Sequence, residues 1–190
     1  IEPSAGWRLF NWSELKRYHE LLFYLVWRDI KVQYKQMVLG PLWAIIRPVV
    51  NLVIFVIIFG AIIGVPSEGP YPVIVQAGML PWMFFSGAVI AASNSLLNNA
   101  HVVSKIYFPR VLLPMSSIGT GLLTLVINLA IYAGMMAYYH TYPSWSVLWL
   151  PALVCLTATL ALGIGLLLAG LAVIYRDVRI IVSSMIQMWM

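Results

Sequence analysis

Residues 111–175 read VLLPMSSIGTGLLTLVINLAIYAGMMAYYHTYPSWSVLWLPALVCLTATLALGIGLLLAGLAVIY and contain no formally charged side chain. A helix that crosses a bilayer needs about 20 apolar residues to span the hydrocarbon core. This run is therefore long enough for two spans with a connection between them. Polar and turn-forming residues gather at 140–145, which marks the connection. The stretch alone predicts a chain that crosses a membrane twice.

The composition of the whole chain supports a polytopic membrane protein. Of its 190 residues, 62% are hydrophobic and 9% are charged, whereas an average soluble domain has about 25% charged residues. This excludes a soluble globular domain, a disordered segment and a disulfide scaffold. Two shorter runs without charge, 48–67 and 69–104, each accommodate one further span. We expect an all-α membrane protein with spans at about 44–64, 73–97, 111–139 and 147–174, and a fifth that begins at about 180.

The residues before the first span form a different kind of segment. Between Ser13 and Gln36 the apolar residues recur at helical spacing, with most charged residues on the opposite face. A helix with these two faces lies in the membrane interface; the alternative is an ordinary surface helix packed on a domain. We expect 1–42 to be a cytoplasmic amphipathic interface segment and 43–190 to be the transmembrane domain, a helix bundle.

Lys and Arg are distributed unevenly over the segments between the spans. They occur in the N-terminal segment, in the connection 98–110 and in the turn 175–179, but not in the two other connections. Short cytoplasmic loops are enriched in Lys and Arg, so the N-terminus and the even-numbered connections are predicted to be cytoplasmic. The net charge of +5 therefore reflects orientation in the membrane and not binding to nucleic acid.

No reaction centre is visible in the spans. There is no Asp or Glu between Gly69 and Arg176, and intramembrane acid–base enzymes and proton-coupled carriers usually need an ionisable residue there. The sequence has no P-loop motif, and its histidines (His19, His101, His140) have no Cys or carboxylate at metal-ligand spacing. We therefore expect no catalytic residue, no metal and no cofactor in this chain.

Two stripes of residues recur at four-residue spacing on the third and fourth spans. The fourth span carries small residues, which let helices approach closely: Ala161, Gly165 and Ala169. The third span carries polar residues on one face: Ser116, Thr120, Thr124 and Asn128. The polar stripe either packs helix against helix or lines a conduit through the membrane.

Two further features are candidates for contact with a transported molecule. Trp82 and Phe85 flank the mid-span Pro81, where they either pack in the core or stack on the C–H faces of sugars. Arg47 lies at the start of the first span. It either extends to the cytoplasmic headgroups or faces an internal path, where it would meet an anionic phosphate.

The connection 98–110 gathers basic, apolar and aromatic residues in a short space: Lys105, Ile106, Tyr107, Phe108 and Arg110. A bare turn between two spans does not need an exposed apolar set, so the set indicates a docking surface for a partner. The alternative is that Tyr107 and Phe108 anchor the loop in the interface. Arg28 and Asp29 of the N-terminal segment would make a second contact with the same partner.

Four strings of residues resemble the permease subunits of ABC-2-type polysaccharide exporters. They are 25–48 (LVWRDIKVQYKQMVLGPLWAIIRP), 78–85 (GMLPWMFF), 93–114 (SNSLLNNAHVVSKIYFPRVLLP) and 171–179 (LAVIYRDVR). The family exports lipopolysaccharide O-antigen, capsule or teichoic acid across the bacterial inner or plasma membrane. The resemblance runs in the same order over nearly the whole chain.

The resemblance implies a non-catalytic transport subunit that has an interface helix and six spans in its full length. It implies a homodimer driven by two ATP-binding cassette subunits, which use ATP and Mg. Polyprenyl-linked glycan would cross the membrane between the two permeases, which are surrounded by membrane lipids.

The family's coupling region falls on 98–110. The resemblance therefore assigns contact with the ATPase subunit to Lys105, Ile106, Tyr107, Phe108, Arg110, Arg28 and Asp29, and contact with glycan to Trp82 and Phe85. One alternative is an ABC-2 permease for another lipid or a drug. Another, from a different class, is a polytopic membrane glycosyl- or acyltransferase, whose acidic candidates are Asp29, Glu68 and Asp177.

Overall fold

The computed structural model describes residues 18–35, 42–62, 64, 66, 69–103, 105, 108–175 and 177–189. All regular structure in these ranges is helical, and no strand occurs among them. The helices are α2 (His19–Tyr34), α3 (Trp43–Phe55), the π-helix η2 (Val56–Ile62), α4 (Tyr71–Asn98), α5 (Ala100–Val103), α6 (Leu112–Tyr138), the 3-10 helix η3 (Trp145–Trp149), α7 (Leu150–Ile174) and α8 (Val178–Met188). The predicted all-α fold is confirmed.

Within the described ranges, four helical segments are long and apolar enough to cross a membrane: Trp43–Gly60, Tyr71–Asn98, Leu112–Tyr138 and Trp145–Ile174. Together they make a polytopic bundle, as the composition predicted. The expected first span, 44–64, corresponds to α3 and the π-helix that continues it to Ile62. Of the interface segment, α2 is described, whereas residues 1–17 and 36–41 lie outside the described ranges.

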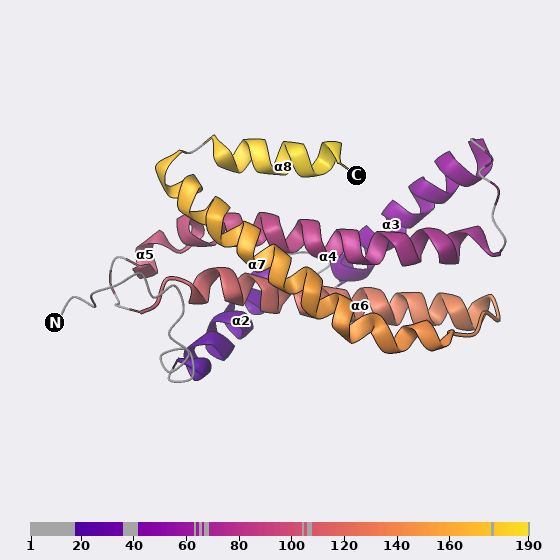
Figure 1. Cartoon of the computed structure of the whole chain (residues 1–190), viewed down its shortest axis with the longest axis horizontal. Coiled ribbons are helices and arrows are strands. Elements are labelled where there is room, and N and C mark those ends of the chain that lie inside the picture. The colour runs from indigo at the N-terminus through magenta and orange to yellow at the C-terminus, as the bar shows by residue number, and fades with distance from the viewer. Residues whose placement is uncertain are drawn as a thin grey trace.

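Helix α4 is the centre of the bundle. It packs against α7 and α6 over long stretches, and against α3 and α8 over shorter ones. In Figure 1, α4 and α6 run side by side, α7 crosses both, and α8 turns back along α4. The buried core follows this arrangement, because Phe84 and Ala88 of α4 pack with Ile118 of α6, Ala161 of α7 and Val182 of α8.

Small residues bring α7 against α4. Ala161, Gly165 and Ala169 are fully or nearly fully buried. A Cβ atom built on Gly165 would lie only 2.5 Å from the Cβ of Ala92 in α4. The small-residue stripe therefore serves close helix packing, as small residues at this spacing do in membrane proteins.

The connections between successive helices lie at two opposite ends of the bundle. The α4–α6 and α7–α8 connections lie at one end, and the α3–α4 and α6–α7 connections lie at the other (Figure 1). The first of these ends carries the exposed Lys105, Arg110 and Arg179, and is called the basic end below. Helix α2 also lies there, because its Arg28 hydrogen bonds to Asn99 at the end of α4.

Gln76 of α4 is a buried polar residue inside a span. Its side chain is 1% exposed, and neither Nε2 nor Oε1 has a hydrogen-bond partner in the part of the chain that the structure describes. A buried amide without partners costs about 1–3 kcal/mol of folding free energy.

We expect Gln76→Met, which keeps the length of the side chain and removes the amide, to leave stability unchanged or raise it by about 1 kcal/mol. Thermal unfolding of the detergent-solubilised protein measures this. The matched control is Gln187→Met on the exposed face of α8. A clear drop in unfolding temperature for Gln76→Met alone would mean that the amide is hydrogen-bonded in the folded protein.

Candidate functional site

The connection between α4 and α6 is the candidate functional site. Helix α4 ends at Asn98, and the carbonyl oxygen of Asn99 then accepts hydrogen bonds from the N–H groups of Val102 and Val103 (2.9 and 3.1 Å). Asn99 thus closes α4 and opens the short α5. Residues 108–110 lead from there into α6.

An apolar cluster holds this connection against α2. Its buried members are Leu25 of α2, Phe108 of the connection, and Leu112 and Leu113 of α6. Phe108 is 7% exposed. Its ring therefore anchors the connection from inside, and is not displayed on the surface.

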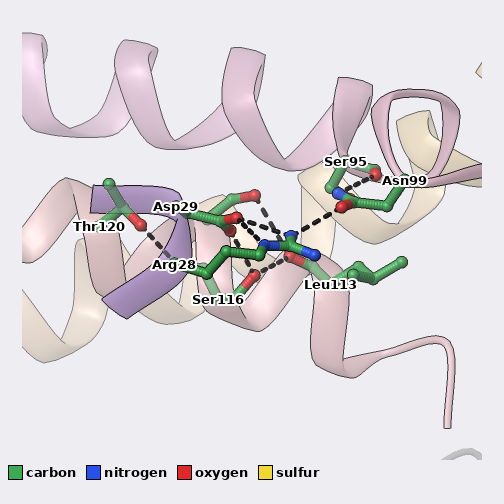
Figure 2. A network of polar contacts seen from close by, with 8 residues as sticks. Arg28, Asp29, Ser95, Asn99, Leu113, Ser116 and Thr120 are labelled. Carbon is green, nitrogen blue, oxygen red and sulfur yellow. Dashed lines mark hydrogen bonds and ion pairs between the residues drawn. The ribbon is translucent and has the colours of Figure 1, made fainter. Parts of the chain in front are cut away.

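A polar network lies beside the cluster and joins three helices (Figure 2). The Nε and Nη2 atoms of Arg28 donate hydrogen bonds to Oδ1 of Asp29, at 3.0 and 2.7 Å. Nη2 carries two protons and also donates to Oδ1 of Asn99, at 2.6 Å. The Ser116 hydroxyl donates to Oδ2 of Asp29, at 3.0 Å. Helix α2 is thereby bonded both to the end of α4 and to the start of α6.

Further hydrogen bonds orient the members of this network. Nδ2 of Asn99 donates to the carbonyl oxygen of Ser95 at 2.9 Å, so Oδ1 is the atom that points toward Arg28. The Ser116 hydroxyl also lies 2.9 Å from the carbonyl oxygen of Leu113. Its single proton prefers the carboxylate, because a charged acceptor makes the stronger bond.

The residues predicted to contact an ATPase subunit fall into three groups. Lys105 and Arg110 are exposed, whereas Ile106 and Tyr107 lie outside the described residues. The others are turned inward: Phe108 joins the apolar cluster, and Arg28 and Asp29 form the network. Contact of these seven residues with an ATPase subunit stays a prediction.

Arg28 lies differently from what its place on the helix suggested. The helical period of residues 13–36 predicts Arg28 on the polar face, together with Lys31 and Lys35. In the structure its side chain is only 27% exposed and that of Asp29 only 23%. The face of α2 that packs on α6 includes Val26, whose Cγ2 would be 2.7 Å from a Cβ at Gly119. Arg28 and Asp29 can be half-buried next to this contact between α2 and α6 because they form an ion pair and are hydrogen-bonded.

The structure brings Trp82 and Phe85 together and adds a third aromatic side chain. The ring centroids of Trp82 and Phe85 are 6.2 Å apart, and those of Trp82 and Trp189 are 6.3 Å apart. Trp189, just after α8, is 81% exposed. Its place beside Trp82 was missed because a sequence does not show which distant segments meet. Arg47 is exposed on α3, outside this aromatic group.

The polar stripe of α6 is largely satisfied by its own helix. The side chains of Thr120, Thr124 and Asn128 donate to the carbonyl oxygens of the residues four positions earlier. Ser116 and Asn128 are buried, and the two threonines are half-buried. Ser116 belongs to the network at the basic end, and a conduit along the rest of the stripe stays a prediction.

These features define a multi-pass α-helical membrane protein with an amphipathic helix packed at its basic end. The chain belongs to the ABC-2 type transporter family, because the family model described as ABC-2 type transporter matches residues 20–190. The relationship therefore includes α2 as well as the spans.

Two curated relatives show which members of this family the chain is similar to. The chain is 30% identical over 178 residues to the O-antigen export system permease protein RfbA of Myxococcus xanthus, covering 93% of this chain and 67% of the relative. It is 28% identical over 165 residues to the protein of the same name from Klebsiella pneumoniae, covering 86% of this chain and 63% of the relative. The chain thus spans about two thirds of the length of these relatives.

Proposed function

We propose that this chain is the membrane-spanning permease subunit of an ATP-driven ABC exporter that moves lipid-linked polysaccharide across the bacterial inner or plasma membrane. The observation that carries the proposal is the similarity to O-antigen export permeases over 93% of the chain. The four apolar spans and the helix at their basic end agree with that role.

In this proposal the N-terminus and the basic end face the cytoplasm. The argument is the placement of Lys105, Arg110 and Arg179 at one end, since short cytoplasmic loops are enriched in Lys and Arg. ATP is available on that side. Two separate ATP-binding subunits would bind and hydrolyse ATP with Mg there, and this chain would contribute no catalytic residue.

The 98–110 connection is the part of this chain that would receive the movement of the ATP-binding subunit. It is exposed at Lys105 and Arg110, which offer positive charge to an acidic surface. Its other side is fixed to α2 and α6 through Phe108. A displacement of the connection by the ATP-binding subunit would therefore move α2, α4 and α6 together.

Glycan linked to a polyprenyl lipid would cross between two copies of the chain, with membrane lipids around the dimer. Trp82, Phe85 and Trp189 offer aromatic faces on which the C–H faces of sugars stack. Arg47 on α3 would meet the phosphate of the lipid carrier, to which a guanidinium binds well.

The decisive test of the class is purification of the full-length protein from its host with whatever binds it. We expect a P-loop ATPase subunit to co-purify, ATP hydrolysis by the complex, and none by the permease alone. Reversal of charge at the connection, Lys105→Glu with Arg110→Glu, should release most of the ATPase subunit, whereas Arg179→Glu on α8 should not. A purified single subunit that transfers sugar or acyl groups would instead support a membrane transferase.

A further inference from the structure

We propose that Arg28, Asp29, Asn99 and Ser116 act as positioning residues: they form a polar clamp that holds α2 in register with both ends of the 98–110 connection. The clamp would make α2, the end of α4 and the start of α6 move as one body when an ATP-binding subunit presses on the connection. This inference rests on the proposed function.

The clamp residues Asn99 and Ser116 flank the connection in the sequence, and both are hydrogen-bonded to α2. Asn99 lies at the start of the connection and Ser116 in the first turns of α6, so almost the whole connection lies between them. The bonds from α2 to these residues join positions 71 and 87 residues apart. Figure 2 shows Arg28 and Asp29 between Asn99 on one side and Ser116 on the other.

Each member of the clamp has a chemical task that few other residues could perform. The guanidinium of Arg28 serves Asp29 and Asn99 together through its planar fork, which the point charge of a lysine does not reproduce. The carboxylate of Asp29 uses one oxygen for Arg28 and the other for Ser116. Loss of one member therefore leaves a charged partner with one hydrogen bond fewer.

The geometry favours positioning over adhesion. The apolar cluster of Leu25, Phe108, Leu112 and Leu113 already holds α2 on the bundle, but apolar contact is not directional. Hydrogen bonds to charged groups are directional and short, so they fix where α2 sits along α6. Solvent still reaches the pair of Arg28 and Asp29, which are 27% and 23% exposed, and screens its charges, so the ion pair itself adds little to stability.

The same geometry argues against direct docking by Arg28 and Asp29. Both Asp29 oxygens and the Nε and Nη2 atoms of Arg28 are already bonded within the chain. The Nε proton and both Nη2 protons of Arg28 are used, and Oδ1 of Asp29 accepts two of them, so a partner would have to break these bonds in order to use those three atoms.

The experiment uses the full permease with its ATP-binding subunit in proteoliposomes and measures glycan exported per ATP hydrolysed. For Arg28→Lys, Asn99→Ala and Ser116→Ala we expect normal amounts of bound ATP-binding subunit and a fall in export per ATP of about tenfold, the size of one lost charge-assisted hydrogen bond. Asn99→Asp keeps an acceptor for Arg28 and should restore most of the export.

Two controls match these variants on the same helices. Ser117→Ala removes a hydroxyl whose one hydrogen-bond partner among the described residues is the carbonyl oxygen of Leu113. Lys31→Ala removes an exposed cation of α2 that lies 5.2 Å from the centroid of the Trp27 ring. Both controls should export as the unmodified protein does.

Three results would overturn the clamp. The first is unchanged export per ATP in all three variants. The second is loss of the bound ATP-binding subunit, which would assign Arg28 to docking. The third is a fall in protein abundance with unchanged export per ATP, which would make the network purely structural.

A second measurement is independent of transport. Hydrogen exchange of the α2 backbone amides should be faster in Ser116→Ala than in Ser117→Ala, at equal unfolding temperatures. Equal exchange in the two variants would overturn the clamp even in a protein that exports nothing. If the unmodified protein neither binds an ATP-binding subunit nor exports glycan, the proposed function fails, and the exchange rates decide on the clamp alone.

Discussion

Gly165→Leu is expected to abolish the packing of α7 on α4 and with it the folded protein. A Cβ at Gly165 would lie 2.5 Å from the Cβ of Ala92, an atom that cannot move away without its backbone. Overpacking a core typically costs about 1–3 kcal/mol when side chains can adjust, and here the two helices themselves must separate. We expect a loss of about tenfold or more in membrane abundance, which corresponds to about 1.4 kcal/mol or more; quantitative immunoblotting measures it.

Gly163→Leu is the matched control for this substitution. Gly163 lies on the same helix, is exposed, and has no atom within 4 Å of a Cβ built on it among the described residues. The same leucine should therefore be tolerated there with normal abundance. Normal abundance and an unchanged unfolding temperature for Gly165→Leu would contradict the close contact of α4 and α7.

Phe108→Ala is expected to detach the 98–110 connection from α2 and α6. Truncation of a buried phenylalanine costs about 3–5 kcal/mol, and Phe108 is buried against Leu25, Leu112 and Leu113. We expect faster proteolytic cleavage within the connection, a lower unfolding temperature and loss of ATP-driven export. Limited proteolysis in detergent, followed by mass spectrometry of the fragments, locates the cleavage.

Phe23→Ala provides the comparison on α2, where the ring of Phe23 is 72% exposed. It removes the same atoms from a surface position and should change neither cleavage nor unfolding. If Phe108→Ala behaved like Phe23→Ala in every measurement, Phe108 would not anchor the connection. A variant that kept its stability but lost the ATP-binding subunit would make Phe108 a docking residue.

The spans were predictable because membrane crossing is a property of sequence length and composition. Charge-free runs of sufficient length predicted four crossings, and helices α4, α6 and α7 occupy almost the expected ranges. The small-residue stripe of α7 was equally readable, since a four-residue period puts Ala161, Gly165 and Ala169 on one face.

The polar network was not predictable from the same reasoning. A helical periodicity sorts side chains by polarity, so it placed Arg28 on the polar face and gave no sign that a paired charge would turn inward. Its partners Asn99 and Ser116 are distant in the sequence, and only the packing of α2 on α4 and α6 brings them within hydrogen-bond distance. Ser116 had been assigned to a polar stripe, which is correct for its helix but misses its bond to Asp29.

The apolar set that the sequence predicts to be exposed in the 98–110 connection shows a second reason why the structure differs from the prediction. Composition indicates that apolar residues in a loop have a partner, but not whether the partner is another protein or the chain itself. Phe108 finds its partner in Leu25 of α2. The basic residues Lys105 and Arg110 remain exposed and are the part of the connection available to another subunit.

The most direct test of the proposed function is the location of lipid-linked glycan in cells that lack this protein. Right-side-out and inside-out membrane vesicles from such cells can be labelled with an impermeant reagent for sugars. Glycan on its lipid carrier should accumulate on the cytoplasmic face and disappear from the outer face, and restoring the protein with its ATP-binding subunit should reverse this. Continued appearance of glycan on the outer face, or a stop in its synthesis without any accumulation, would contradict a role in export.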